Sequence, residues 1–525
     1  MKKFTLIIFI LLIAFNTNAE ITFQKTFGGT GNEYGNSVQQ TFDGGYIIAG
    51  YTDYFGAGGT DAYLIKTDEN GDSLWIKTFG GIEDDFGICV QQTSDSGYIL
   101  VGSTRINVSS TNVYIFKTNA NGDSLWSKSF GGIGENGGNS VQQTADGGYI
   151  ITGYTSYFGA GSYDIYLIKT DANGDSLWTK TFGGISFEYG CSVRQTMDGG
   201  YIVVGYSYGF GAGLEDVYLF KTNANGNLLW SKTFGGADNE FGYSVQQTVD
   251  SGYIITGITK SFAVAAFDYD VYLIKADSNG DILWTKTFGG ISGDYGYSVE
   301  QTTDGGYIIV GNSNGFGGVN VYLMKTNANG DLLWTKAIGS TNACGGRSIQ
   351  QTADGGYIIT GTIYNFGASS NDVYLVKTDS MGNSGCTDVS TATIISSTFT
   401  QVSNQATIVS SPHTIVGAPT AVLGSGGFEN TICTNVGIKE IVIENSLIIS
   451  PNPSSGNFNI SFEKTIIKGI VEISNIFGEN VFIENISNLS KKEIFLKNIS
   501  GGIYFVKVFD GNKSYCKKII IEQEL

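Results

Sequence analysis

Short runs in which apolar and polar side chains alternate recur between residues 20 and 385, and turns rich in glycine separate them. Alternation at every second position is typical of a β-strand with one buried face, and β-branched and aromatic residues dominate these runs. Asp146-Gly147 and Asn173-Gly174 lie in two of the gaps, and both dipeptides favour tight hairpin turns. One such stretch predicts four antiparallel strands, at residues 140–144, 148–155, 164–170 and 177–182.

This stretch is one copy of an internal repeat. A tyrosine follows an Asp-Gly-Gly or Asp-Ser-Gly turn at intervals of 50 to 54 residues. Four antiparallel strands in about 50 residues make one blade of a β-propeller. Seven copies therefore predict an all-β protein with a seven-bladed β-propeller over residues 20–385. The tyrosines are Tyr46, Tyr98, Tyr149, Tyr201, Tyr253, Tyr307 and Tyr357.

The ends of the repeat region predict how the ring closes. Residues 21–29 carry the motif of a fourth strand, with Phe23 where six other copies carry tryptophan, whereas the last copy lacks a fourth strand. We expect the N-terminal strand to complete the last blade, because each blade buries its faces only against its neighbours. The tryptophans suggest a carbohydrate-stacking ring or, as we expect, packing between blades: Trp75, Trp126, Trp178, Trp230, Trp284 and Trp334.

The composition changes at residue 386. Residues 386–440 are rich in serine and threonine and predict a linker or a small β module, which Cys386 and Cys433 bracket as a possible disulfide. Disulfides are available to an exported protein. From residue 441 short apolar runs separated by glycine turns return, and they predict a small β-sandwich over residues 441–525.

The C-terminal region carries the motif residues of a known family in the same order. The matching positions are Pro451, Asn452, Pro453, Gly456, Phe458, Ile476, Phe477, Gly478, Gly502 to Val508 with Tyr504, and Lys517 to Ile521. Residues 447–525 thus resemble the type A C-terminal sorting domain of the type IX secretion system of Bacteroidota. The resemblance implies recognition by the type IX machinery, passage through the outer membrane, and release or attachment at the cell surface.

The first residues also predict export. Lys2 and Lys3 precede an apolar run at 6–15, and Thr17-Asn18-Ala19 follows, as in a secretory signal peptide over residues 1–19. No second apolar run is long enough to cross a bilayer, so we expect no transmembrane segment in the mature chain.

Composition excludes several classes of function. The 525 residues carry a formal net charge of −18, which would repel a phosphate backbone and argues against a nucleic-acid partner. The single histidine, His413, lies outside the repeats, so no histidine-based nucleophile–base pair can be assigned. We predict no cofactor. The acidic hairpin Asp68–Asp72 and its counterparts leave calcium open, although the hairpin is far shorter than an EF-hand loop.

Two sets of loops predict a ligand-binding face. The loops after the fourth strands carry acid–aromatic pairs, and the loops after the second strands carry aromatic-glycine motifs. In a propeller both sets open on one face, which would suit a glycan, a peptide or a cation. The alternative is that the aromatics fill gaps between blades and the acids are solvated. The candidates are Glu33, Glu188, Glu240, Tyr54, Phe55, Tyr157, Phe158, Phe210, Phe316 and Phe366.

The first strand of each repeat predicts the lining of a central channel. Its channel-facing position is Gln39, Gln91, Gln142, Arg194, Gln246, Glu300 and Gln350 in turn. Arg194 and Glu300 replace two amides of this ring and carry opposite charges, so both are candidates for orienting a ligand. The alternative is solvated side chains in a wet channel.

These features predict a secreted or cell-surface propeller that acts as a binding or adhesion module for a glycan or a protein. An extracellular polysaccharide-acting enzyme using two loop carboxylates is the alternative. The motif at 166–178 is similar to repeats of quinoprotein-type propellers, which supports only the fold. One structural feature would distinguish the binding module from the enzyme. If the insertion at 262–270 and the irregular loop at 340–347 both flank one pocket, the enzyme is favoured.

Overall fold

The structure is a computed structural model whose described residues are all strands and their connections. It describes residues 21–521 except 316–317, 340–342, 365–369, 387, 391–393, 398–400, 404–407, 411–414, 418–421, 425–427, 437–446, 476–479, 497–498 and 510–513. The predicted signal peptide lies outside these residues. Two compact units are present, Glu20–Val436 and Gly437–Leu525. Across the described ranges, no helix has the length and apolarity needed to cross a membrane.

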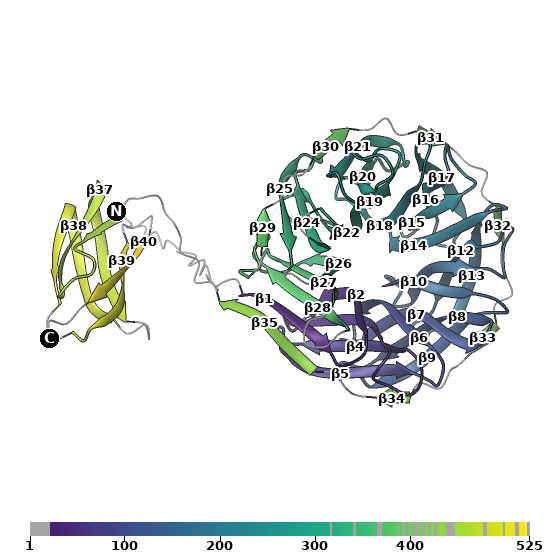
Figure 1. The fold of residues 1–525 in the computed structure, drawn as a ribbon, viewed down its shortest axis with the longest axis horizontal. Coiled ribbons are helices and arrows are strands. Elements are labelled where there is room, and N and C mark those ends of the chain that lie inside the picture. Colours follow the sequence, from purple (N-terminus) through teal and green to yellow (C-terminus); the bar gives the residue numbers. More distant parts are fainter. Residues whose placement is uncertain are drawn as a thin grey trace, which may run out of the picture. The chain divides into compact units, whose positions relative to one another are not determined.

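The first unit contains seven four-stranded antiparallel sheets in a propeller-like arrangement around a centre (Figure 1). Sheets 1 to 3 are β2 (Glu33–Gln40), β3 (Tyr46–Thr52), β4 (Asp61–Thr67) and β5 (Ser73–Gly80); β6 (Asp85–Gln92), β7 (Tyr98–Asn107), β8 (Ser110–Thr118) and β9 (Ser124–Gly131); and β10 (Asn136–Gln143), β11 (Tyr149–Thr155), β12 (Asp164–Thr170) and β13 (Ser176–Gly183). Sheets 4 and 5 are β14 (Phe187–Gln195), β15 (Tyr201–Tyr208), β16 (Glu215–Thr222) and β17 (Leu228–Gly235); and β18 (Glu240–Gln247), β19 (Tyr253–Thr259), β20 (Asp270–Ala276) and β21 (Ile282–Gly289).

Sheets 6 and 7 complete the set, and the second of them joins the two ends of the repeat region. Sheet 6 is β22 (Asp294–Gln301), β23 (Tyr307–Ser313), β24 (Asn320–Thr326) and β25 (Leu332–Ile338). Sheet 7 is β26 (Cys344–Gln351), β27 (Tyr357–Tyr364), β28 (Asn371–Thr378) and the N-terminal strand β1 (Ile21–Gly28). β1 pairs antiparallel with β28, with Phe23 opposite Lys377 and Phe27 opposite Val373. The N-terminal strand therefore occupies the position that the sequence predicts for it.

The hydrophobic core lies between the sheets rather than within them. Seven buried clusters each combine residues of two neighbouring sheets, and one of them joins sheet 7 to sheet 1 through Phe23, Val38 and Ile358. The tryptophans belong to these junctions: Trp75 packs on Tyr98 of the next sheet at a ring distance of 5.9 Å, and a side chain on Gly122 of that sheet would overlap its indole. Packing between sheets, the expected role of the tryptophans, is thus confirmed.

Two sets of hydrogen bonds also join the sheets at their inner strands. The last glutamine of every first strand accepts a bond from a backbone N–H in the turn of the preceding sheet, at 2.8–2.9 Å in all seven junctions. The residue before it accepts from the next first strand at six junctions; Gln350 Oε1, for example, accepts from Gln40 N at 2.6 Å. These bonds link sheet 7 to sheet 1 in the same way as the other sheets.

Residues 386–436, which we call the belt, differ from both expectations, a linker and a small β module. Seven short strands of the belt each pair antiparallel with the outer strand of one sheet, in reverse chain order, at the periphery of the ring (Figure 1). Their order and partners are β29 (Asp388–Ser390) on β25, β30 (Ile394–Ser397) on β21, β31 (Gln401–Ser403) on β17, β32 (Ile408–Ser410) on β13, β33 (Ile415–Gly417) on β9, β34 (Val422–Gly424) on β5 and β35 (Phe428–Val436) on β1.

The belt covers the outer edges of the sheets and its ends are joined. Outer strands present unpaired backbone groups that invite edge-to-edge association, and the fifth strand satisfies part of them. Cys386, just before the belt's first strand, forms a disulfide with Cys433 in its last strand, with a Cα–Cα distance of 6.3 Å. Gln24 of β1 lies opposite Cys433 in the ladder, so the bridge sits beside the N-terminal strand.

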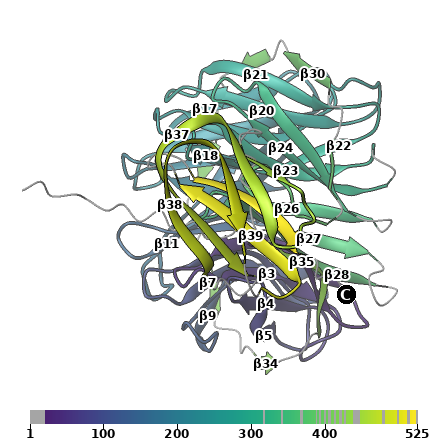
Figure 2. The ribbon, with the colours of Figure 1, turned by 90° about the vertical axis from the view of Figure 1, so that its left-hand side faces the viewer.

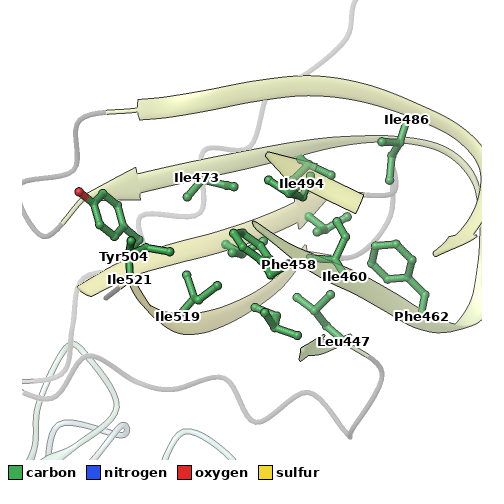
Figure 3. Packing of buried hydrophobic residues seen from close by; sticks show 14 residues of the cluster. Leu447, Phe458, Ile460, Phe462, Ile473, Ile486, Ile494, Tyr504, Ile519 and Ile521 are labelled. Carbon is green, nitrogen blue, oxygen red and sulfur yellow. The ribbon is translucent and has the colours of Figure 1, made fainter. Parts of the chain in front are cut away.

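The second unit is a small β domain. Its strands are β36 (Leu447–Ser450), β37 (Asn457–Asn475), β38 (Asn480–Phe495), β39 (Gly502–Phe509) and β40 (Ser514–Ile521), in the order β36-β37-β39-β40 with β38 paired to β37. β37 and β38 form a long curved hairpin (Figure 2). Phe458, Ile460, Ile473 and Ile519 point into one apolar core (Figure 3).

The motif residues of this unit hold its first strand against its last. Asn452 Nδ2 donates to Lys518 O at 2.9 Å, and Asn452 Oδ1 accepts from Ile520 N at 2.9 Å. Gly456 has a φ of +100°, a conformation that favours glycine, and its carbonyl accepts from Leu496 N. Tyr504 is buried, and its hydroxyl donates to Ser500 O at 2.9 Å. Ile476, Phe477 and Gly478 lie outside the described residues.

The disulfide predicts a measurable stabilisation. Closing a loop between cysteines 47 residues apart stabilises a fold by about 2–4 kcal/mol, because the unfolded chain loses conformational freedom. We expect Cys386→Ser with Cys433→Ser to lower the free energy of unfolding in urea by that amount and to admit protease into the belt first. Cys89→Ser, which restores the serine that the other six sheets carry there, is the control. Equal stability of the double variant and the native chain would contradict the prediction.

Candidate functional site at the channel mouth

A bulge in the first strand of every sheet inserts one extra residue into the ladder. The pairing register shifts at the same point in all seven sheets, for example between Gly242 and Ser244. Bulges re-aim side chains, and they are frequent beside binding sites. The residues around each bulge repeat, whereas the bulge residue itself varies: Asn36, Ile88, Asn139, Cys191, Tyr243, Tyr297 and Arg347.

Three neighbouring sheets use this position to build a cluster, which we call the mouth cluster: Tyr243, Tyr297 and Arg347. The two tyrosine rings lie 5.3 Å apart, and the Arg347 guanidinium lies 4.5 Å from the centre of the Tyr297 ring. Burial raises the pKa of both tyrosines, so both hydroxyls keep their protons at neutral pH, while the nearby Arg347 charge acts in the opposite direction. Arg347 itself is exposed.

The irregular parts of the repeat converge on this cluster. Tyr269, from the insertion at 262–270, lies 6.4 Å from Phe241 and 6.0 Å from Tyr295. Phe241 and Tyr295 stack in turn on Tyr243 and Tyr297 at 6.3 and 6.2 Å. Arg347 is the last residue of the irregular loop at 340–347, of which residues 340–342 lie outside the described part. Both departures from the repeat thus contribute to one site.

A line of ring contacts extends the site over two further sheets. Tyr154 contacts Tyr189 at 5.1 Å, Tyr189 contacts Tyr206 at 5.2 Å, and Tyr206 contacts Phe241 at 4.8 Å. Because Phe241 joins Tyr243, the aromatic surface runs from sheet 3 to sheet 6. We call Tyr154, Tyr189, Tyr206 and Phe241 the aromatic arc.

A polar cavity of about 230 Å³ follows the bulges along the channel. It is lined by the serines, the valines or isoleucine and the amides that come directly after the bulge residues, including Gln39, Arg194 and Glu300. Burial raises the pKa of Glu300 to about 7, against the smaller effects of a hydrogen bond from Gln351 N and of the Arg194 charge. Arg194 donates to Val193 O at 2.9 Å. The predicted break in the amide ring therefore places a cation and a near-neutral acid in one cavity.

The loop acids are not on the surface where the sequence suggested them. Glu33, Glu188 and Glu240 are each 0 % exposed. Glu188 accepts from Gly184 N at 2.7 Å and from Ser207 Oγ at 2.7 Å, and Glu33 and Glu240 accept equivalent bonds. Their carboxylates order the turn that follows the fourth strand, so they contribute no charge to an exposed face.

Each of these acids faces an acid of the neighbouring sheet. A side chain on Gly183 would overlap both Asp164 Oδ1 and Glu188 Oε2, which explains the glycine after each Phe of the fourth strands. The buried pairs are Asp372 with Glu33, Asp61 with Asp85, Asp164 with Glu188, Asp216 with Glu240 and Asp270 with Asp294. The equivalent pair at the junction of sheets 2 and 3 is uncharged, Asn112 with Asn136.

Burial, reinforced by the charge of a neighbouring acid, favours the protonated form of one acid in these pairs. It raises the pKa of Asp61, Asp216 and Asp270 to about 6 and that of Asp372 to about 7. Oδ1 of Asp61, Asp164, Asp216 and Asp270 accepts no hydrogen bond within the described part of the chain. A proton shared across the junction would satisfy those atoms. Because the arrangement recurs at five junctions, it belongs to the frame of the ring.

The loop aromatics divide into two groups. Phe55, Phe158 and Phe210 are half-buried and pack over the ends of their own sheets, on Tyr63, Tyr166 and Tyr218 at 6.3, 6.0 and 5.5 Å. Tyr54 and Tyr157 are exposed, at 58 % and 54 %, on sheets 1 and 3. Phe316 and Phe366 lie outside the described residues. The aromatic positions thus fill gaps in part, and among the loop aromatics that the structure describes, Tyr54 and Tyr157 are the exposed ones.

The acidic hairpins use their first side chain within the turn. Asp68 Oδ1 accepts from Asn70 N and from Asp72 N, both at 2.9 Å. Asn119 accepts the same two bonds in the next sheet, which explains why aspartate and asparagine alternate there.

The mouth cluster is the part of the site that the sequence-based selection missed. Its signal was present: one position of the repeat varies while its neighbours stay constant. The predicted site residues were residues that recur from repeat to repeat. A single binding site among seven similar sheets is instead marked by a position whose residue differs between the repeats.

The comparisons with known proteins identify the second unit. Residues 449–522 match the family model of the secretion system C-terminal sorting domain. This unit is a type IX secretion sorting domain. The sorting domain directs the chain to the cell surface or the extracellular space. Its motif residues Asn452, Gly456 and Tyr504 are those that hold the domain's strands together.

Solved structures resemble the chain only remotely. Sqt1 of Chaetomium thermophilum bound to the N-terminus of ribosomal protein L10 is 10 % identical with a TM-score of 0.40, over 67 % of this chain and 98 % of that one. The polysaccharide lyase Uly1 is 10 % identical with a TM-score of 0.40, over 66 % and 90 %. A putative glycoside hydrolase from Parabacteroides distasonis is 9 % identical with a TM-score of 0.24, over 60 % and 85 %. At these scores none supports a conclusion about this chain. No curated protein matches it.

The acid pairs predict that stability falls as pH rises. The folded chain holds protons that the unfolded chain releases, so this contribution is complete below about pH 4 and is lost as pH rises through 6 to 7. We expect Asp61→Asn, which imitates the Asn112–Asn136 junction, to raise the melting temperature at pH 8 by a few degrees and to flatten its pH dependence. Asp68→Asn in the exposed hairpin is the control. A steeper fall in the Asp61 variant would contradict a shared proton.

Proposed function

We propose that this secreted chain is a closed seven-bladed β-propeller that binds a glycan at the mouth cluster. Closure is supported by the hydrophobic cluster between sheets 7 and 1 and by the bond from Gln40 N to Gln350 Oε1. A rigid ring suits a binding module, because the ligand-facing side chains are positioned by strands rather than by loops.

One observation carries the proposal. The bulge position holds Tyr243, Tyr297 and Arg347 in three consecutive sheets, and the aromatic arc continues this surface over two more. Flat aromatic rings with polar edges pack on the apolar faces of sugar rings while their hydroxyls bond to sugar hydroxyls. The cavity beyond them is polar and suits the hydrated end of such a ligand.

A polysaccharide-acting enzyme is the second candidate. It is favoured by the convergence of the insertion and the irregular loop on one site, through Tyr269 and Arg347. The loop acids first considered for catalysis are buried in the junctions. An acid for such an enzyme would instead be Asp268, whose charge adds to the effect of burial in raising the pKa of Tyr295, or Glu300 in the cavity.

Glycan-array binding of the secreted chain, with product analysis of each hit, tests the proposal. Tyr243→Asn and Tyr297→Asn introduce the residue that sheets 1 and 3 already carry at the bulge, so the frame should accept them. We expect each to weaken binding about tenfold or more, a change of about 1.4 kcal/mol. Tyr54→Asn and Tyr157→Asn on the exposed loops should leave binding unchanged.

The outcomes separate the candidates. Retained glycan of unchanged length, with loss in the bulge variants alone, supports binding at the mouth cluster. Shortened glycan would replace this proposal with the enzyme. Loss in the loop variants alone would move the site to the loops, and an array without any hit would refute glycan binding.

A further inference from the structure

The arginines of this acidic chain differ in whether they pair with a carboxylate. The chain has a net charge of −18 and only three arginines. Arg105 pairs with Asp84, with Nη2 3.1 Å from Oδ2. Arg194 and Arg347 form no ion pair within 4.0 Å with any carboxylate of the described residues; Arg194 lines the channel cavity, and Arg347 occupies the bulge position of its first strand. The two arginines that lack a carboxylate partner therefore belong to the channel and its mouth.

Arg347 is positioned by Tyr297 and keeps hydrogen-bond donors for a ligand. Its guanidinium carbon lies 4.5 Å from the centre of the Tyr297 ring, and a hydrogen bond from Arg347 acts on the Tyr297 hydroxyl. A guanidinium carries five N–H donors in a planar fork, so one such bond leaves others for a ligand, and the residue is exposed. A guanidinium positioned in this way has lost part of its freedom already, so it can bind a planar carboxylate with two parallel hydrogen bonds at low entropic cost.

The surroundings of Arg347 favour an anion further. Its charge acts on Tyr51, Tyr243 and Tyr297, whose pKa values burial raises, so these phenols stay protonated and offer O–H donors. The acids of the adjacent junctions do not compete, because Asp294 and Asp372 are buried and paired within the frame. Tyrosines from three sheets thus lie within electrostatic reach of a cation that forms no ion pair with a carboxylate of the described residues.

We propose that the mouth cluster recognises an acidic glycan through a uronate carboxylate bound by Arg347. This inference rests on the glycan-binding function proposed above and specifies its ligand. The sugar ring would pack beside Tyr243 and Tyr297 while its carboxylate meets the guanidinium edge. At 0.1 M salt the repulsion between the net negative charge of the chain and an anion is screened beyond about 10 Å, so recognition depends on the direct contact with Arg347.

The test measures binding of the secreted chain to polygalacturonate, alginate and glucuronan, each beside its carboxyl-reduced, uncharged form. We expect at least one uronate polymer to bind about tenfold or more tightly than its reduced form. Arg347→Gln should remove that preference, and Arg347→Lys should keep only part of it, because an ammonium cannot make the paired bonds. Arg105→Gln is the control, since that arginine is paired with Asp84.

Each outcome decides one question. Equal binding of charged and reduced polymers, unaffected by Arg347→Gln, would overturn the acidic ligand and leave glycan binding intact. Binding of dextran sulfate in place of every uronate polymer would overturn the carboxylate. A preference for uronate that survives in Arg347→Gln and is lost in Arg194→Gln would overturn the assignment to Arg347. Failure of every glycan, charged or neutral, would refute the proposed function itself.

Discussion

The structure depends on one constraint: a four-stranded sheet of this repeat cannot bury its own faces. Every hydrophobic cluster of the first unit lies between two sheets, so each sheet is stable only between neighbours. The N-terminal strand matters for this reason, because β1 supplies Phe23 and Phe27 to the cluster between the last sheet and the first. The glutamine bonds, the tryptophans and the paired acids all act at the same junctions, and they explain why so much of the repeat is constant.

The sheets repeat the same residues at their junctions, whereas the candidate site is built from residues that do not repeat. The frame repeats, because each junction solves the same packing problem, and its acids recur as buried pairs. The site appears where repetition ends, at a bulge position whose side chain differs from sheet to sheet. Arg347, Tyr243 and Tyr297 occupy positions at which Asn36 and Asn139 serve equally well as structure: both asparagines donate to a backbone carbonyl of the next sheet.

Much of the fold could be predicted from the sequence, because the repeat, its turns and the misplaced fourth strand are local patterns. The belt could not, since its strands β29 to β34 are three or four residues long and pair with strands far away in the chain. The burial of Glu33, Glu188 and Glu240 was also hidden. An acid beside a glycine turn looks solvated until its partner, such as Asp164, is found across the junction. The sorting domain was recognisable because its motif residues are fixed by contacts within it, as Asn452 is.

The joined ends of the belt have a mechanical consequence. When the chain is held through its C-terminal unit, tension enters the ring unit at Val436. β35 lies antiparallel to β1 along Ile21–Gly28, so a pull along the strand loads these ladder bonds in shear, all together, instead of opening them one after another. Only two residues separate Val436 from Cys433, and the disulfide there carries tension across to Cys386. A force on the tail is thus distributed over the ladder between β35 and β1, the strand that pairs with β28 of the last sheet.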